Sequence, residues 1–544
     1  MTLGKYQNHI QFVFYEVIVL LAIPSFISIP VRTAFVLYAT FLYWIITNTN
    51  LPTFTLPPSE QSLTRFWRIL LVSSIVFFIA SRLYPFLRYG EAPLGYDTGF
   101  YIQYYRIIDA LQSISPLSIS TSHFTYAWWL PFIAFKIPAL WTINILHITH
   151  QILTLGAVYF LTNSIPEFSK KPIPTFSIIL FSLSTTQYMA FWWMFYKQSM
   201  AIPFFLFGIG LMLRRHWLAF YFIGIGAAIH FQTVIPLAAA LIAHVFLQCI
   251  FRWRKREKIF KFTARSLGAG LLILVIILIL KGPHELLYYW EYIQRLQGLA
   301  TNAPELEVLQ AKGLFIPPTT YSLNSMYYLP FGILGFLHCL QWFRNKRDEK
   351  VFPLVLLIVL TILSVFPFIY QNRSLIFLDV LLIVFASPVL FIFIQRFLGM
   401  HRHAAPMLIV FLLSAFMFSG RIIVNHPPQV PPEELSALKQ LPALMKPSSY
   451  VMTTSSTYAP WVWAFTDRET IAPGLLNWDR WNYTDWKQFW FSQDDKKRIV
   501  LLNMYNAPIY IFIGKNQPFP DPLKAFLVKE TQPLTQYVWK YEPH

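Results

Sequence analysis

The stretch Arg88-Tyr-Gly-Glu-Ala-Pro-Leu-Gly-Tyr-Asp-Thr-Gly-Phe-Tyr-Ile-Gln-Tyr-Tyr-Arg106 gathers acids, arginines and tyrosines directly after an apolar run that ends near Tyr84. Its glycines and Pro93 interrupt any continuous helix and allow tight turns. We therefore expect Asp97 to lie at a bend, with a short helix after it. Such a bend would present an acid at the membrane surface, although an acid between glycines also fits an ordinary solvated turn.

The composition indicates a membrane protein. Of the 544 residues 56% are hydrophobic, 18% aromatic and only 12% charged, and the mean hydropathy is +0.48. These values are too apolar for a soluble globule, and the apolar residues fall in runs long enough to cross a bilayer. The net charge of +18 comes from basic residues clustered in short loops, which indicates membrane topology and no nucleic-acid partner.

About thirteen apolar runs qualify as membrane spans. They cover residues 10–29, 31–48, 66–85, 139–163, 175–193, 199–213, 217–231, 234–250, 264–281, 325–343, 351–369, 374–395 and 404–421. If the strongest basic loops are cytoplasmic, the N-terminus is cytoplasmic and the C-terminal segment is extracytoplasmic. The sequence predicts a multi-pass protein of the cell membrane.

The polar segments divide this chain into a membrane module and a small domain. Residues 1–421 form the module, with large outer loops at 86–138 and 282–324. Residues 422–544 open with a proline-rich linker and continue with a short helical pattern and β-rich runs. We predict a small extracytoplasmic mixed α/β domain there.

Several cationic side chains fall near the predicted outer ends of spans. The candidates for binding a lipid phosphate are Lys197, Arg373, His230 and Arg88. A phosphate at the membrane interface needs charge-assisted hydrogen-bond donors, which these residues supply. Each could instead be an interface anchor, and a lone histidine is often a packing residue.

Sequence motifs of soluble enzymes are missing. The chain has no phosphate-binding loop, no dinucleotide-binding glycine run after a strand and no His-Glu-x-x-His or Cys-x-x-Cys pattern. A divalent metal held by Asp97 and an acid of the 282–324 loop stays open, because oxygen-ligand sites leave little trace in a sequence.

Five short motifs are spread along the chain. They are Gly95-Tyr-Asp-Thr-Gly-Phe-Tyr101, the Ala-Trp-Trp-Leu-Pro run ending at Pro131, Ala228-Ile-His-Phe-Gln232, Asn372-Arg373 and Ala459-Pro-Trp-Val-Trp-Ala-Phe-Thr-Asp-Arg468 with Pro473-Gly474. With these motifs the chain resembles the C-type (GT-C) integral-membrane glycosyltransferases, which include protein O-mannosyltransferases, oligosaccharyltransferases and aminoarabinose transferases. The resemblance implies a GT-C-like fold and a sugar donor linked to a polyprenyl phosphate. It also implies an inverting transfer on the outer face, with Asp97 as the catalytic base.

Two departures from the GT-C pattern affect these expectations. An extra hairpin precedes the first outer loop, and Thr98 follows Asp97 where some branches carry a second acid. Glu91, or an acid of the 282–324 loop, would then have to supply any second carboxylate.

The residue chemistry agrees with a glycosyltransferase. A carboxylate can take the proton of an attacking hydroxyl, and cations can stabilise the leaving phosphate. Tyr101 and Tyr105 suit stacking against a sugar ring, although an aromatic interface belt explains most other rings. Glu291 is a further candidate for binding the sugar or the acceptor.

We therefore hypothesise a glycosyltransferase that uses a polyprenyl-phosphate-sugar donor. The acceptor could be a glycan, a lipid or a protein, and membrane lipids surround the chain. One alternative is a polysaccharide polymerase or ligase with two lipid-linked substrates, in which the outer arginines would matter more than Asp97. Another is a non-catalytic transporter of lipids or glycans, which would favour charges at mid-membrane and repeated halves.

Overall fold

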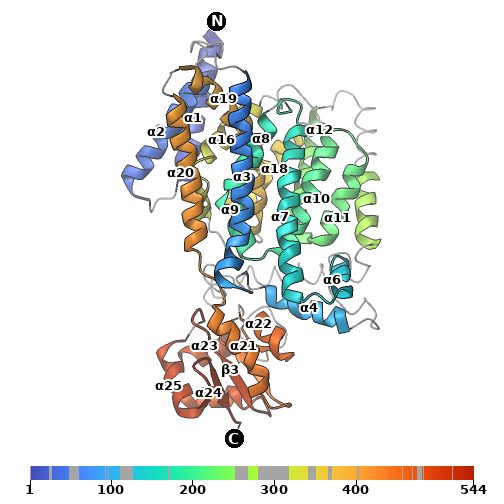
Figure 1. The fold of residues 1–544 in the computed structure, drawn as a ribbon, viewed down its shortest axis with the longest axis vertical. Coiled ribbons are helices and arrows are strands. Elements are labelled where there is room, and N and C mark those ends of the chain that lie inside the picture. The colour runs from blue at the N-terminus through green and yellow to red at the C-terminus, as the bar shows by residue number, and fades with distance from the viewer. Residues whose placement is uncertain are drawn as a thin grey trace.

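The computed structural model describes most of the chain. The described residues are 2–23, 27–47, 60–91, 94–95, 97–110, 126–169, 172–251, 268–279, 318–340, 351–365, 371–400, 404–455, 458–468, 470–473, 481, 483–517 and 519–543. A helical bundle and a smaller C-terminal α/β domain lie at opposite ends of an elongated molecule (Figure 1). Glu291 and most of the 282–324 loop lie outside the described residues.

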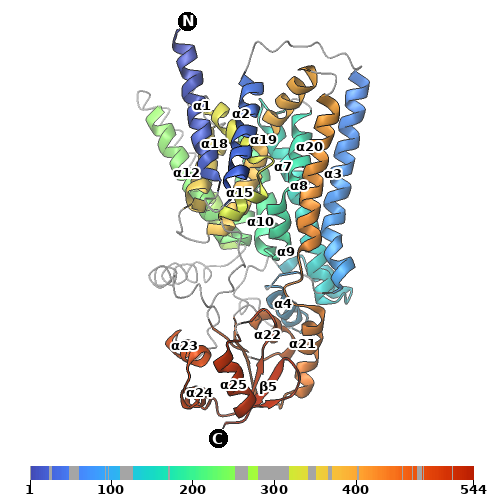
Figure 2. The ribbon, with the colours of Figure 1, turned by 90° about the vertical axis from the view of Figure 1, so that its left-hand side faces the viewer.

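The bundle consists of helices that run mostly along the long axis of the molecule (Figures 1 and 2). Its labelled helices are α1 (Thr2–Ala22), α2 (Ile29–Thr47), α3 (Glu60–Tyr89), α4 (Thr98–Ala110), α6 (Leu130–Ala134), α7 (Ala139–Ser164), α8 (Ile173–Leu183), α9 (Thr185–Trp192), α10 (Tyr196–Leu213), α11 (Leu218–Ile229), α12 (Phe231–Phe251), α15 (Pro318–Asn324), α16 (Leu329–Cys339), α18 (Val351–Val365), α19 (Gln371–Met400) and α20 (Ala404–Asn425). Within the described residues, seven helices are long and apolar enough to cross a membrane, and six shorter apolar helices accompany them. The predicted polytopic α-helical membrane fold is confirmed, and each predicted span contains a helix.

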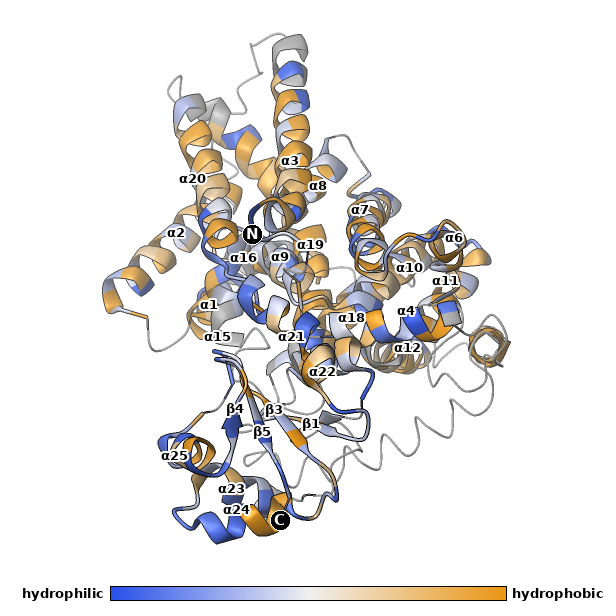
Figure 3. Ribbon diagram, turned by 60° about the horizontal axis from the view of Figure 1, so that its bottom comes forward, coloured by the Kyte–Doolittle hydropathy of each residue, from blue (hydrophilic) through white to orange (hydrophobic). Residues whose placement is uncertain are grey.

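The outer surface of the bundle is apolar. Met417 of α20 is 75% exposed and Ile242 of α12 is 72% exposed. Hydrophobic residues dominate α3 and α20, whereas hydrophilic residues are frequent on the C-terminal helices (Figure 3). Exposed apolar side chains in such numbers suit contact with lipid chains and not with water.

The predicted span 175–193 is divided into α8 and α9 at Ser184. The backbone of Ser184 is extended there, with ψ at 114°, and its Oγ accepts a hydrogen bond of 3.2 Å from the Gln187 N–H. This is an N-cap, which ends one helix and starts the next. The apolar pattern alone does not show the break, because the capping serine lies inside the continuous apolar run 175–193.

A buried carboxylate joins the helices around this break. Asp379 of α19 accepts hydrogen bonds from Ser184 Oγ at 2.8 Å, Gln187 Nε2 at 2.9 Å and Tyr321 Oη at 3.3 Å, and also from Tyr328 Oη. Its side chain is fully buried, and all four donors are neutral. Charges inside a membrane bundle persist where such partners satisfy them, so Asp379 connects α9, α15 and α16 to α19.

Replacing Asp379 with Leu is expected to lower the apparent Tm in detergent by several degrees. The change removes an acceptor shared by four buried donors, of which Gln187 Nε2 keeps the Ile376 carbonyl, and each donor left unsatisfied costs about 1–3 kcal/mol. Ser387→Ala in the same helix is the matched control, because the Ser387 hydroxyl donates to the Ile383 carbonyl of its own helix. Thermal unfolding followed by tryptophan fluorescence measures both variants, and an equal Tm for the two would contradict the joining role of Asp379.

The C-terminal domain contains a five-stranded sheet in the order β2-β1-β3-β5-β4. Its elements are α21 (Pro432–Leu444), β1 (Tyr450–Thr453), α22 (Ala459–Thr466), β2 (Thr470–Ile471), α23 (Tyr483–Phe491), α24 (Asp495–Leu502), β3 (Ile509–Phe512), α25 (Asp521–Glu530), β4 (Gln532–Pro533) and β5 (Val538–Tyr541). Strand β1 runs parallel to β2 and β3, whereas β5 runs antiparallel to β3 and β4.

The two faces of this sheet belong to different cores. Val451 and Phe512 join the large core that continues into the bundle, while Met452 and Ile511 join a separate core with the tryptophans of α23. Successive side chains of a strand point to opposite faces, which explains the alternation. One face of the sheet is therefore directed at α22 and the bundle.

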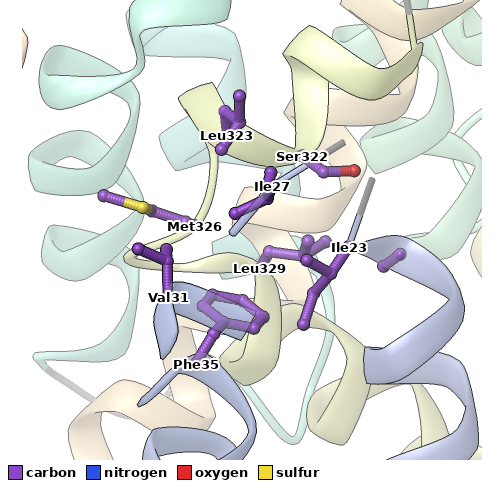
Figure 4. A pocket seen from close by; sticks show the side chains of 9 residues that line it. Ile23, Ile27, Val31, Phe35, Ser322, Leu323, Met326 and Leu329 are labelled. Atoms are coloured by element: carbon purple, nitrogen blue, oxygen red, sulfur yellow. The ribbon is translucent and has the colours of Figure 1, made fainter. Parts of the chain in front are cut away.

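An apolar pocket lies between the N-terminal hairpin and the α15–α16 segment (Figure 4). It is lined by Ala22, Ile23, Ile27, Val31, Phe35, Ser322, Leu323, Met326 and Leu329. None of the predicted site residues lines this pocket, so it offers no acid or cation for chemistry.

Candidate functional site

Asp97 lies in the turn directly before α4. Gly95 has φ of +56°, and its N–H donates a hydrogen bond of 2.9 Å to the Trp192 carbonyl. Any Cβ at Gly95 would overlap Met194, so only glycine fits this close approach. The Thr98 hydroxyl bonds to the Leu94 carbonyl at 2.8 Å, and the Tyr101 N–H bonds to the Asp97 carbonyl at 3.2 Å. The predicted bend and short helix are both present.

Two cations act on the Asp97 carboxylate. Arg373 lies in the first turn of α19, and Lys197 is the second residue of α10. Burial raises the pKa of Asp97, while the charges of Arg373 and Lys197 oppose the rise, and the net pKa is above the ordinary value. The Asp97 residue nevertheless keeps part of its surface exposed. The site therefore combines an acid with two cations whose charges act on it.

His230 holds the guanidinium of Arg373. Its Nε2 lies 3.1 Å from Arg373 Nη1, and its Nδ1 lies 2.6 Å from the Thr233 hydroxyl. A guanidinium has donors only, so Nε2 must accept and the imidazole is neutral in this contact. Gln198 Nε2 also donates to the Arg373 carbonyl at 2.7 Å, and the Phe195 ring lies 5.5 Å from the guanidinium carbon. Arg373 is thus fixed from several sides.

Aromatic side chains border the same site. The Tyr101 ring lies 5.0 Å from that of Tyr196 and 6.5 Å from that of Trp129. The Trp129 indole donates to the Tyr196 hydroxyl at 2.9 Å, and Lys197 Nζ lies 5.9 Å from the centre of the Tyr126 ring. The site therefore combines an acid, two cations and aromatic faces, which is a suitable lining for a sugar phosphate.

Glu91, the other predicted acid within the described residues, lies elsewhere. Glu91 forms an ion pair of 2.5 Å with Lys439 of the C-terminal domain, and both side chains are about half exposed. Glu91 is not among the charges that shift the pKa of Asp97. Glu291 lies outside the described residues.

Arg88 and Tyr105 also have partners of their own. The Arg88 guanidinium donates to the Val424 carbonyl at the end of α20. The Tyr105 hydroxyl donates to the Ile137 carbonyl at 2.6 Å, with its ring near Trp129. Of the predicted site residues, the structure brings together Asp97, Lys197, Arg373, His230 and Tyr101.

The buried cation Arg82 was not among the residues predicted from the sequence. Arg82 lies fully buried in α3, with its guanidinium carbon 4.4 Å from the centre of the Phe78 ring and 5.5 Å from that of Tyr188. Its position inside the apolar run 66–85 was the available signal, because an arginine within a span requires internal partners. Cation–π contacts supply those partners here.

Metal binding receives no support from the described residues, among which no group of three or more His, Cys, Asp or Glu side chains is arranged to hold an ion. The acids of the 282–324 loop that could join Asp97 lie outside that part of the chain. A metal site built with this loop stays a prediction.

Known proteins resemble this chain in fold and not in sequence. A scan against protein-family models found no match, and neither did a sequence search among curated proteins. Among solved structures, an oligosaccharyltransferase from Archaeoglobus fulgidus in complex with zinc and sulfate gives a TM-score of 0.54 at 13% identity, covering 81% of this chain and 68% of that chain.

Two further structures show the same arrangement. AglB, the archaeal oligosaccharyltransferase of A. fulgidus, in complex with an inhibitory peptide and a dolichol-phosphate, gives a TM-score of 0.53 at 12% identity, covering 82% of this chain and 69% of that chain. ArnT from Cupriavidus metallidurans in the apo state gives a TM-score of 0.52 at 10% identity, covering 88% of this chain and 98% of that chain. Both are GT-C glycosyltransferases, so the chain is an integral membrane protein with a GT-C-like fold, as the sequence predicted.

Proposed function

We propose that this protein is an inverting glycosyltransferase that moves a sugar from a polyprenyl-phosphate-linked donor to an acceptor on the extracytoplasmic face. The supporting observation is Asp97, a partly exposed residue whose carboxyl group feels the charges of both Arg373 and Lys197. The GT-C-like fold adds to this proposal, since AglB was solved with a dolichol-phosphate. The acceptor is a glycan, a lipid or a protein.

Asp97 acts as the general base in this reaction. An acceptor hydroxyl attacks the anomeric carbon, and its proton passes to the Asp97 carboxylate as the new C–O bond forms. The bond between the anomeric carbon and the phosphate oxygen breaks on the opposite side, which inverts the configuration. The polyprenyl phosphate leaves with the electron pair of that bond.

Arg373 and Lys197 bind the donor phosphate and stabilise the charge that grows on it. A phosphate is already an acidic leaving group, so cations serve it better than a general acid. Neutral His230 keeps the guanidinium of Arg373 in place without adding a charge. Tyr101, whose ring packs against Tyr196, forms the aromatic wall on the sugar side in this proposal.

The end of the bundle that carries Asp97 faces the extracytoplasmic side in this proposal. Helices α3, α10 and α19 each have one end near Asp97. Their opposite ends carry or adjoin the basic residues Arg65, Arg68, Arg214, Arg215 and Arg396. Basic residues favour the cytoplasmic side, so the far end of these helices is cytoplasmic, as is the N-terminus.

A transfer assay in proteoliposomes tests the proposal. The purified protein is given a panel of undecaprenyl-phosphate-linked sugars together with a membrane extract as the source of acceptors. Release of undecaprenyl phosphate with the sugar appearing on an acceptor is the expected result. Movement of intact lipid-linked sugar across the bilayer without release would favour the transporter alternative, and growth of a long polymer would favour a polymerase.

The pH dependence of transfer is expected to follow Asp97. Because its pKa is raised and the base must be ionised, transfer should increase as the pH rises through that pKa. Lys197→Gln removes a charge that lowers the pKa, so the acid limb of the pH–rate profile should move to higher pH. Lys439→Gln is the control, since Lys439 pairs with Glu91. A profile that shifts equally in both variants, or in neither, would contradict this assignment.

A further inference from the structure

The helix α22 of the C-terminal domain packs against α4, the helix that follows Asp97 (Figures 1 and 2). The contact is close, because a Cβ at Gly99 would overlap the backbone of Pro460. The Trp463 ring lies 5.8 Å from that of Phe100 and 5.9 Å from that of Tyr104. The domain therefore rests directly on the segment that carries the proposed base.

Polar contacts add to this packing. Gln103 Nε2 donates to the Asp467 carboxylate, and Arg106 Nη1 donates to the Ala464 carbonyl. Asp467 ends α22 in the left-handed conformation, with φ of +55°, which brings its short side chain back toward α4. One face of α4 is thus joined to α22 along its length.

One contact reaches the catalytic turn itself. The fully buried Trp461 indole donates through Nε1 to the Gly95 carbonyl at 3.1 Å. The N–H of Gly95 is held at the same time by the Trp192 carbonyl at 2.9 Å. The residue two positions before Asp97 is therefore fixed on one side by the bundle and on the other by the C-terminal domain.

We propose that Trp461 is a positioning residue for Asp97, so that the C-terminal domain completes the active site. The inference rests on the proposed function of Asp97 as the base. The indole fixes the Gly95 peptide in a conformation that only glycine adopts readily, and this sets the direction in which the chain enters the Asp97 turn. Without that bond, Gly95, two positions before Asp97, would be held only by the Trp192 carbonyl among the contacts described above, and the Asp97 turn would be less constrained.

Trp461→Phe tests the positioning role in the full-length protein in lipid nanodiscs. The variant keeps a ring against Phe465 but leaves the buried Gly95 carbonyl without its donor. Hydrogen–deuterium exchange of the peptide covering residues 94–106 should become faster by on the order of tenfold, as expected from the loss of one buried hydrogen bond. The matched control is Trp463→Phe, which retains a ring against Phe100 and Tyr104 and should change the exchange much less.

Kinetics separate positioning from general loosening of the fold. In Trp461→Phe, kcat for release of undecaprenyl phosphate should fall about tenfold while KM for the donor stays within about twofold, in line with a disturbed base and intact binding. The acid limb of the pH–rate profile should also move, because the distances from Asp97 to its two cations change. A simple loss of folded protein would lower the rate without moving that limb.

Gln103→Leu is a second variant that tests the same interface if Trp461→Phe does not fold. It removes the Asp467 contact from the same interface without touching the Gly95 peptide, so its effect on exchange and kcat should have the same direction and be smaller. Unchanged exchange at 94–106 in Trp461→Phe, or faster exchange with an unchanged kcat and pH profile, would overturn the positioning role. Full activity of Asp97→Asn would instead refute the proposed function and leave the exchange result standing.

Discussion

Replacing Asp97 with Asn should lower sugar transfer by about 10²–10⁴-fold, the usual contribution of a general base. Asparagine keeps the shape of the side chain but cannot take the proton of the acceptor hydroxyl. Donor binding should survive, because Arg373 and Lys197 remain and the phosphate site loses an anion. The measurement pairs the rate of undecaprenyl phosphate release with equilibrium binding of undecaprenyl phosphate to the same protein preparation.

Asp109→Asn is the matched control for this experiment. Asp109 is an exposed acid in the same helix α4, so its removal tests the effect of a general charge change near the site. Its transfer rate should stay within about twofold of that of the unchanged protein, as is usual for surface substitutions. Retained transfer in Asp97→Asn would remove the base from the mechanism and favour a polymerase or ligase that depends on the outer arginines.

Much of the bundle could be predicted from the sequence, because a lipid environment constrains it strongly. A span must be helical and apolar over a fixed length, so the runs of hydrophobic residues locate the helices. The break at Ser184 could not be found this way. It depends on a capping serine that also bonds to Asp379, almost two hundred positions later in the chain.

The candidate site was partly predictable for a related reason. Lys197, His230 and Arg373 each lie where a predicted span meets its outer turn, and helices that cross together bring such ends to one level. In the structure His230 lies against Arg373, and Arg373 and Lys197 both act on Asp97. Sequence spacing indicates how deep a residue lies along the axis of the bundle, but not toward which neighbouring helix its side chain points. For that reason Arg88, which turns toward Val424, appeared to be an equal candidate.

Contacts between the bundle and the C-terminal domain had no local signal. Trp461 follows Gly95 by more than three hundred positions, and nothing near either residue indicates the hydrogen bond between them. The pair Glu91 and Lys439 is equally distant in sequence. Both contacts depend on how the C-terminal domain packs on the helical bundle, which composition and periodicity do not determine.

Replacing Arg373 with Gln should weaken binding of undecaprenyl phosphate by about 10- to 100-fold. A hydrogen bond to a charged group contributes about 1.5–3 kcal/mol, and each 1.4 kcal/mol corresponds to a factor of ten in affinity. The affinity of Arg373→Lys for undecaprenyl phosphate should lie between those of the unchanged protein and Arg373→Gln. Lysine keeps the charge but lacks the planar guanidinium that His230 and Phe195 contact. Binding is measured by titration of purified protein in nanodiscs.

Two comparisons make this result specific to the phosphate. Arg396→Gln changes another arginine of the same helix, at its opposite end, where the guanidinium donates to the Ile45 carbonyl at 3.0 Å. Its affinity for undecaprenyl phosphate should be unchanged even if the Tm falls. Raising the salt concentration should weaken binding to the unchanged protein more than binding to Arg373→Gln, because the variant has one charge fewer to screen. Equal affinities of Arg373→Gln and the unchanged protein would place the phosphate elsewhere and remove Arg373 from the donor site.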